Sequence, residues 1–293
     1  MKKIKTIIFI IIVISLTACT NNNNEIIKEL NDANIKVAVS IVPEAAFVRA
    51  VAGEDIIVTT MIPPGQSEEN FAPSPKLMKE LSDAQIYFSI GVPTEQANIF
   101  NKLDDFNSEL KIVELNKEVA EVYEEITLES GGTDPHIWLS PKRVIVMIET
   151  IKDELTIIDP ENKDKYETNA KEYIKELEEV NVEIENSLKN LENKTIIVYH
   201  PAFGYFAQDF GLKMIALEEE GKEATPEDFR RVIDYAKENN IKVIFYQAEV
   251  DSKQSDTFAT EIGGKSIQVE PLSGDYIENL KKMAELFSEV SDN

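Results

Sequence analysis

Only two histidines occur in the chain, and each stands next to a proline that stiffens the local backbone. His136 follows Pro135, whereas His200 follows the apolar segment 196–199 and precedes Pro201. We expect that apolar segment to be a β-strand, and open α/β sheets bind ligands in the crevice beyond the carboxyl ends of their strands. Neutral imidazole is a ligand for zinc, copper, iron and nickel. Either histidine alone is equally well explained by packing, but the two together indicate a metal site.

Carboxylates are the other candidate ligands, and they are far more numerous. The chain has 54 acidic and 30 basic residues, which gives a net charge of −24. This surplus attracts cations diffusely but does not build a specific site, so we expect most carboxylates to be solvated. The same charge excludes a broad nucleic-acid-binding surface, and we expect no nucleic-acid partner.

The first 18 residues have the pattern of a secretory signal peptide. Three early lysines precede the apolar run Ile7–Leu16, which is too short to cross a bilayer because a spanning helix needs about 20 apolar residues. Cys19 is the only cysteine, and its position after small residues resembles a bacterial lipobox, in which the cysteine is lipidated. We therefore expect a signal peptide at 1–18 and a lipid-anchored flexible tether at 19–33 that holds the protein at the bacterial cell membrane. A plain signal peptide with an incidental cysteine is the alternative.

Short β-rich runs alternate with helical stretches in two blocks, which predicts an α/β fold of two lobes, each with a parallel sheet flanked by helices. We expect an N-terminal α/β lobe at 34–158 and a C-terminal α/β lobe at 194–293. The expected strands are 35–41, 56–62, 86–90, 111–115, 195–199, 212–217, 243–247 and 266–269. The expected helices are 44–52, 75–82, 93–103, 226–239, 253–262 and 274–290.

A long polar segment, 159–193, lies between the two blocks and has no glycine or proline after Pro160. Its apolar residues recur at steps of three or four from Tyr166 to Leu191, which predicts a long helix with one narrow apolar stripe. A dimeric coiled coil would also bury such a stripe. The position between two lobes favours a single bridging helix in a monomer.

The motifs along the chain resemble those of the zinc- and manganese-binding lipoproteins of ABC importers, the metal-binding cluster of solute-binding proteins. Each motif is weak alone, but their order is specific. The resemblance implies an extracytoplasmic protein that captures a divalent transition metal and delivers it to an ABC transporter permease. The motifs are Ser40–Pro43, Met61–Gly65, Pro73–Pro75, Leu81–Ala84, Asp134–Trp138, Tyr199–Phe203 and Val269–Leu272.

Proteins of this cluster hold one metal ion between two lobes with four side chains, and the resemblance implies that these ligands are Glu69, His136, His200 and Glu270. Glu69 stands where the family usually has a histidine. Glutamate binds zinc at about 2.0–2.2 Å, so the site can still close. Two alternatives stay open at this position: Glu68 is the ligand and Glu69 faces solvent, or the ligand is lost and water completes the shell.

The expected ligands bear on the choice of metal. Two imidazoles with two carboxylates form a harder set than three imidazoles with one carboxylate, which favours manganese or iron. The residues around His200 instead resemble the zinc-type members, although the acidic loop Val122–Thr133 lacks the histidines that zinc binders often carry there. We expect Zn²⁺ in preference to Mn²⁺.

Two further residues are expected near the site. Trp138 should pack beneath it, and Glu249 should either accept a hydrogen bond from a histidine ring or lie at a solvated edge. We expect no enzyme, because the sequence has neither a His-Glu-x-x-His motif nor a Gly-x-Ser-x-Gly elbow. A metal-dependent hydrolase and a bilobed binding protein for another small solute are the competing interpretations.

Overall fold

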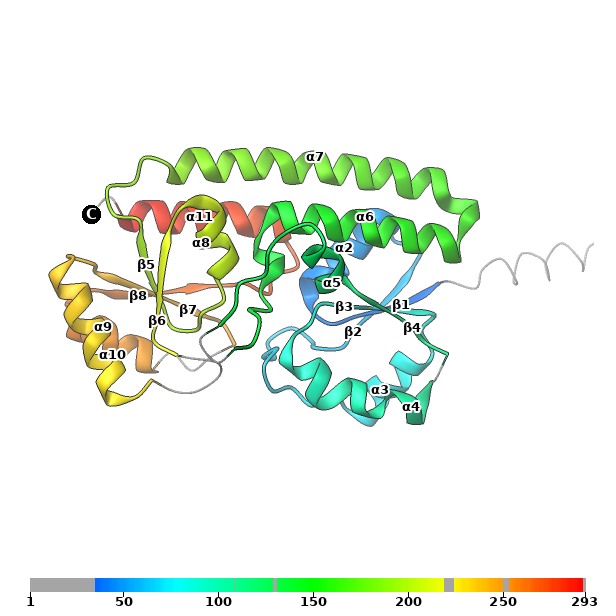
Figure 1. The fold of residues 1–293 in the computed structure, drawn as a ribbon, viewed down its shortest axis with the longest axis horizontal. Coiled ribbons are helices and arrows are strands. Elements are labelled where there is room, and N and C mark those ends of the chain that lie inside the picture. The colour runs from blue at the N-terminus through cyan, green and yellow to red at the C-terminus, as the bar shows by residue number, and fades with distance from the viewer. Residues whose placement is uncertain (1–34, 108, 129–130, 219–223, 250–252, 292–293) are drawn as a thin grey trace, which may run out of the picture. The chain divides into compact units, whose positions relative to one another are not determined.

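The computed structural model describes residues 35–107, 109–128, 131–218, 224–249 and 253–291 (Figure 1). The expected signal peptide at 1–18, the tether at 19–33 and the lipidation site Cys19 lie outside these residues. The segment from Lys36 onward forms one compact unit, which contains two separate four-stranded sheets.

The first sheet has the order β2-β1-β3-β4, and all of its neighbouring strands are parallel. Val37 in the central strand β1 pairs with Val58 on one side and with Ile86 on the other. In Figure 1, helices α2, α5 and α6 lie on one side of this sheet, and α3 and α4 lie on the other. The elements are β1 (Lys36–Val39), α2 (Val42–Ala52), β2 (Ile57–Thr60), α3 (Pro75–Ser82), β3 (Ile86–Ser89), a π-helical segment η1 (Glu95–Phe100), α4 (Asn101–Phe106), β4 (Lys111–Glu114), α5 (Leu115–Ala120), a 3₁₀ turn η2 (Ile137–Leu139) and α6 (Pro141–Ile158).

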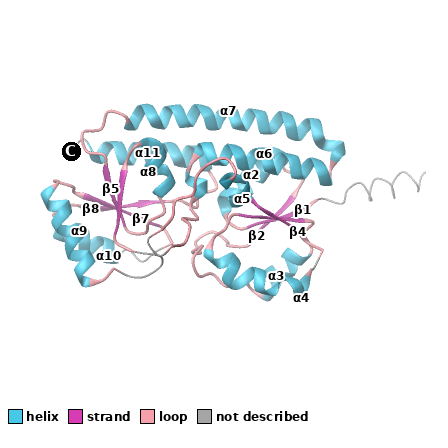
Figure 2. Ribbon diagram, viewed as in Figure 1, coloured by secondary structure: helices cyan, strands magenta, loops and turns pink. Residues whose placement is uncertain are grey.

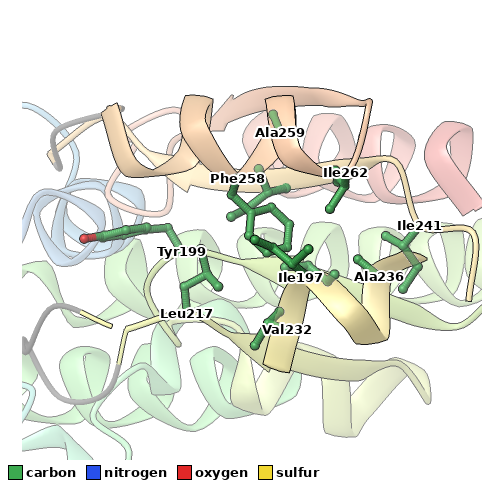
Figure 3. Close-up of a cluster of buried hydrophobic side chains, with 11 residues drawn as sticks. Ile197, Tyr199, Leu217, Val232, Ala236, Ile241, Phe258, Ala259 and Ile262 are labelled. Atoms are coloured by element: carbon green, nitrogen blue, oxygen red, sulfur yellow. The ribbon is translucent and has the colours of Figure 1, made fainter. Parts of the chain in front are cut away.

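The second sheet repeats this arrangement with the order β6-β5-β7-β8, again entirely parallel. One of its faces carries a cluster of buried side chains from β5, β7, α9 and α10, in which Phe258 packs between Ile197 and Ile262 (Figure 3). Phe287 of α11 contacts Phe203 and Phe245 at ring-centroid distances of 5.4 and 4.7 Å. The elements are β5 (Thr195–Val198), α8 (Gly204–Phe210), β6 (Lys213–Ala216), α9 (Pro226–Glu238), β7 (Val243–Gln247), α10 (Lys253–Glu261), β8 (Lys265–Val269) and α11 (Tyr276–Ser291).

A long helix, α7 (Lys163–Leu188), lies along both lobes after a short 3₁₀ turn, η3 (Pro160–Asn162) (Figure 1). Its 26 residues span about 39 Å. The predicted apolar stripe is buried at Tyr166, Leu177 and Ile184 among others, and α7 packs against α2 and α6 in one lobe and against α8 and α11 in the other. The stripe is therefore covered within the same chain, as the bridging-helix interpretation predicted. Among the described helices, none combines the length and the apolar character needed to cross a bilayer.

The sequence patterns predicted the eight strands to within a few residues but did not predict α5, α6 or α8. Helix α6 has clear signals in retrospect. Ser140 caps it by accepting a hydrogen bond from the Arg143 N–H, Pro141 occupies its first turn, and Val144, Met147 and other apolar residues recur at helical spacing. Its many β-branched residues resemble a strand in composition, which obscures that spacing.

Candidate metal centre

Loops gather between the two sheets (Figure 2), and the predicted ligands lie on loops that follow β2, β5 and β8 and on the connection between α5 and η2. His200 comes two residues after the end of β5, as predicted from the apolar run before it. Glu68 and Glu69 lie on the loop between β2 and α3, and His136 directly precedes η2. Because the strands of each sheet are parallel, their carboxyl ends meet at one edge, where such loops can converge.

Three of these side chains converge on one point. The Nε2 atoms of His136 and His200 are 3.2 Å apart, and His136 Nε2 is 3.4 Å from Glu68 Oε1. One ligand atom from each of the three residues lies within 4.8 Å of the others. Two ligands that each bind a tetrahedral zinc ion at about 2.0–2.1 Å are about 3.3 Å apart. The two observed separations match that spacing.

Glu68 provides an independent test of whether a cation fits here. Its side chain is 1% exposed, and neither of its buried oxygens receives a well-formed hydrogen bond among the described residues. A carboxylate buried without hydrogen bonds is costly unless a positive charge compensates it. A divalent ion beside His136 and His200 would supply that charge, so the residues present fit a metal ion.

Each imidazole is oriented by a carboxylate on its far side. His136 Nδ1 is 2.7 Å from Asp134 Oδ1, and His200 Nδ1 is 3.3 Å from Glu218 Oε2. An Nδ1–H that donates to a carboxylate leaves the Nε2 lone pair free to bind a metal, which is the usual arrangement of metal-binding histidines. Sequence reasoning missed both partners. Asp134 could have been found from its place in the His136 motif, whereas nothing in the sequence distinguishes Glu218 from the other acidic residues.

The charges at the site depend on one another. Burial by itself would lower the pKa of His136, but the hydrogen bond to Asp134 and the nearby carboxylate of Glu68 outweigh burial and raise this pKa from 6.5 to about 10. Burial would raise the pKa of Glu68, but His136 and His200 outweigh it and lower this pKa. The buried carboxylates thus favour the protonated form of His136, and the same negative charges would favour a bound cation.

The other predicted ligands lie farther from this group. The Glu69 side chain is 20% exposed, and its Oε1 is 3.7 Å from His200 Nε2. Burial raises the pKa of the Glu69 carboxyl. Glu69 lines a cavity of about 340 Å³ together with His136 and His200, so it stands where the site opens to solvent. Glu270 is exposed and lies outside the three-residue group.

Glu249 and Trp138 both lie close to the centre. Burial raises the pKa of Glu249, and the negative charges of Glu68 and Glu270 raise it further. The carboxylate of Glu249 therefore interacts electrostatically with those of Glu68 and Glu270. The Trp138 ring is fully buried, with its centroid 5.1 Å from that of His136, and its Nε1–H donates to the Pro271 carbonyl at 3.0 Å. Trp138 thereby packs against one proposed ligand and ties its segment to the loop after β8.

Comparison with known proteins identifies the family of this chain. The model of the family described as the periplasmic component A of the zinc-uptake complex, ZnuA, matches residues 37–290. The chain belongs to the ZnuA family. This confirms the resemblance that the ordered motifs indicated.

Individual ZnuA-family relatives agree with this assignment. The chain is 28% identical over 271 residues to the high-affinity zinc uptake system protein ZnuA of Bacillus subtilis, covering 88% of this chain and 85% of that protein. It is 26% identical to the zinc-binding lipoprotein AdcA of Streptococcus pneumoniae, and the match covers 100% of this chain but only 60% of AdcA. A crystal structure of ZnuA superposes with a TM-score of 0.83 at 33% identity, covering 88% of this chain and 99% of that one, which confirms the predicted fold class.

Proposed function

We propose that this protein captures a zinc ion outside the cytoplasm and delivers it to the permease of an ABC importer. The observation that carries the proposal is the convergence of two imidazole Nε2 atoms, 3.2 Å apart, beside the buried carboxylate of Glu68. Membership of the zinc-uptake family supports zinc as the cargo and a membrane transporter as the partner.

We propose His136, His200 and Glu68 as three of the ligands. Glu69 and Glu270, the carboxylates named from the sequence, are the candidates for the fourth position. Glu69 is favoured, because its Oε1 is 3.7 Å from His200 Nε2, whereas Glu270 is exposed. Two imidazoles with two carboxylates suit zinc and also admit manganese. The zinc-binding names of the relatives support zinc as the cargo.

The N-terminal segment completes the proposal. Removal of residues 1–18 and lipidation of Cys19 would anchor a monomer to the outer side of the bacterial cell membrane. Residues 19–33 would serve as a flexible tether. The folded part would then comprise the N-terminal lobe (34–158), the bridging segment (159–193) and the C-terminal lobe (194–293). The name of the AdcA relative, a lipoprotein, supports the anchor.

A metal-dependent hydrolase remains the competing interpretation, because three protein ligands beside a cavity are also the framework of a catalytic zinc site. The two functions differ at the fourth position. A hydrolase keeps water there as the nucleophile, whereas a carrier closes the shell with a protein side chain such as Glu69.

The test is a zinc titration of purified, chelator-treated protein, followed by elemental analysis. We expect about one zinc ion per chain, because the described residues contain one such group of ligands. The variants His136→Ala and His200→Ala should lose stoichiometric zinc, whereas Glu172→Gln, at an exposed position of α7, should retain it. Wild-type protein that binds no zinc would refute the proposal. Failure of the lipidated protein to restore growth of a strain lacking its own zinc carrier, under zinc limitation, would refute delivery.

A further inference from the structure

Helix α8 begins four residues after His200, and it also contacts the segment that carries His136. The Tyr205 hydroxyl accepts a hydrogen bond from the Ile126 N–H at 3.1 Å and donates one to the Asp134 carbonyl at 3.1 Å. The Tyr205 side chain is fully buried. One hydroxyl thus fixes both ends of the chain segment that leads into His136.

The backbone of α8 also touches the carboxylate that orients His136. A Cβ atom on Gly204 would lie 2.3 Å from Asp134 Oδ2, so only glycine leaves room for this carboxylate. The other oxygen of Asp134, Oδ1, is 2.7 Å from His136 Nδ1 and also accepts the His136 backbone N–H at 2.9 Å. Any displacement of Asp134 by α8 would therefore rotate or shift the His136 ring.

A buried arginine holds α8 in place. Arg143 of α6 is 3% exposed, and its guanidinium donates to Asp209 at 3.1 Å and to Gln208 at 3.1 Å, both on α8. The same guanidinium stacks over the Tyr205 ring at 4.3 Å from its centroid. A guanidinium is planar, and here it donates hydrogen bonds to two residues of α8 and lies over the ring of a third. These contacts hold α8 against α6, so α8 can fix the positions of both histidine segments.

We propose that Tyr205 is a positioning residue, which sets the separation of the His136 and His200 Nε2 atoms by tying the His136 segment to the helix that follows His200. This inference rests on the proposed metal-binding function. Metal ligands must be held within about 0.5 Å of their productive positions, and the two rings come from segments 64 residues apart in sequence. Helix α8 is the element that contacts the one segment and continues from the other.

The main test is Tyr205→Phe, which removes the hydroxyl and keeps the ring that stacks on Arg143. We expect zinc affinity, measured by competition with a fluorescent chelator, to fall about 10- to 100-fold, the usual loss when a group supporting a metal ligand is removed. The visible absorption bands of the Co²⁺-loaded variant should also shift, because these bands report ligand geometry. Tyr166→Phe is the matched control. Its hydroxyl also donates a hydrogen bond, in this case to the Asp159 carboxylate next to the η3 turn, and its loss should change neither measurement.

Double variants separate positioning from a general loss of stability. Tyr205→Phe should cause no further loss of zinc affinity when His136→Ala is already present. In the Glu68→Gln background it should lower the affinity by the same factor as in the wild type. If Tyr205→Phe fails to fold, Gly204→Ala tests the same link from the other side, because its methyl group would press on Asp134.

The outcomes are distinct. A lower melting temperature with unchanged zinc affinity and an unchanged Co²⁺ spectrum would overturn the positioning role and leave the proposed function intact. Equal losses of affinity in the His136→Ala and Glu68→Gln backgrounds would also overturn it. Wild-type protein that binds no zinc would instead overturn the proposed function, and this inference with it.

Discussion

Neutralising Glu68 should weaken zinc binding far more than neutralising its neighbour Glu69. The Glu68 side chain is 1% exposed, and its oxygens accept no hydrogen bond from the residues that the structure describes, so its charge would be balanced by the nearby histidines and by a bound ion. Removing one partner of a buried charge pair costs about 3–5 kcal/mol. Since about 1.4 kcal/mol corresponds to a factor of ten, Glu68→Gln should raise the zinc dissociation constant roughly 100- to 4,000-fold.

Glu69 faces a different environment. Its side chain is 20% exposed beside the cavity, so water can take over its place next to the ion. A partly solvated charge contributes about 1 kcal/mol or less, and we expect Glu69→Gln to raise the dissociation constant no more than about tenfold.

The assay is a competition titration of the metal-free variants against a zinc-chelating fluorophore at fixed pH and ionic strength. Glu249→Gln is the matched control, because it removes one negative charge that interacts with Glu68 without belonging to the three-residue group. A larger loss for Glu69→Gln than for Glu68→Gln would refute the assignment of Glu68. Equal small losses for all three variants would refute the premise that any of these carboxylates binds the ion.

Three further predictions concern the histidines and a second buried carboxylate. His136→Ala or His200→Ala should weaken zinc binding by more than about 100-fold, since either loss removes a ligand and not merely its support; an unchanged calorimetric affinity would exclude that histidine. Zinc binding at pH 7 should release about one proton, because His136, with a pKa of about 10 before the ion binds, must lose its proton to coordinate; binding enthalpies that do not vary with the ionisation enthalpy of the buffer would contradict this. Burial and then the charge of Glu95 raise the pKa of Glu44 well above 4.5, so the folded state binds more protons than the unfolded state and loses stability as pH rises above about 4.5. Between about pH 5 and pH 8 the melting temperature of metal-free Glu44→Gln should therefore fall less than that of the wild type, and parallel curves would show that Glu44 does not titrate there.

Much of the fold followed from local patterns. Short β-rich runs of four to seven residues predicted the strands. The signal is clearest for central strands such as β3 and β5, which are buried along most of their length and are therefore mostly apolar. His200 could be placed at a strand end for the same reason. The single long helix was predictable because its stripe of apolar residues is uninterrupted by glycine or proline after Pro160.

The choice between Glu68 and Glu69 could not be predicted, because it depends on loop geometry. Neighbouring residues in a loop point in different directions, and which one faces the histidines depends on backbone contacts made far away in sequence. Here the Thr94 N–H donates to the Glu68 carbonyl at 3.1 Å, and Glu68 is buried while Glu69 faces the cavity. The role of Glu218 beside His200 could not be predicted either, because a residue that supports a metal ligand follows no periodic pattern in the sequence.

Helix α7 limits how such a carrier can release its cargo. It packs on α2 and α6 at one end and on α8 and α11 at the other, so swinging the sheets apart would strip apolar side chains such as Leu177 and Ile184 from their neighbours. A long helix packed on both lobes in this way resists wide hinge bending between them. Unloading at a transporter would then depend on the loops that carry the ligands more than on separation of the two sheets.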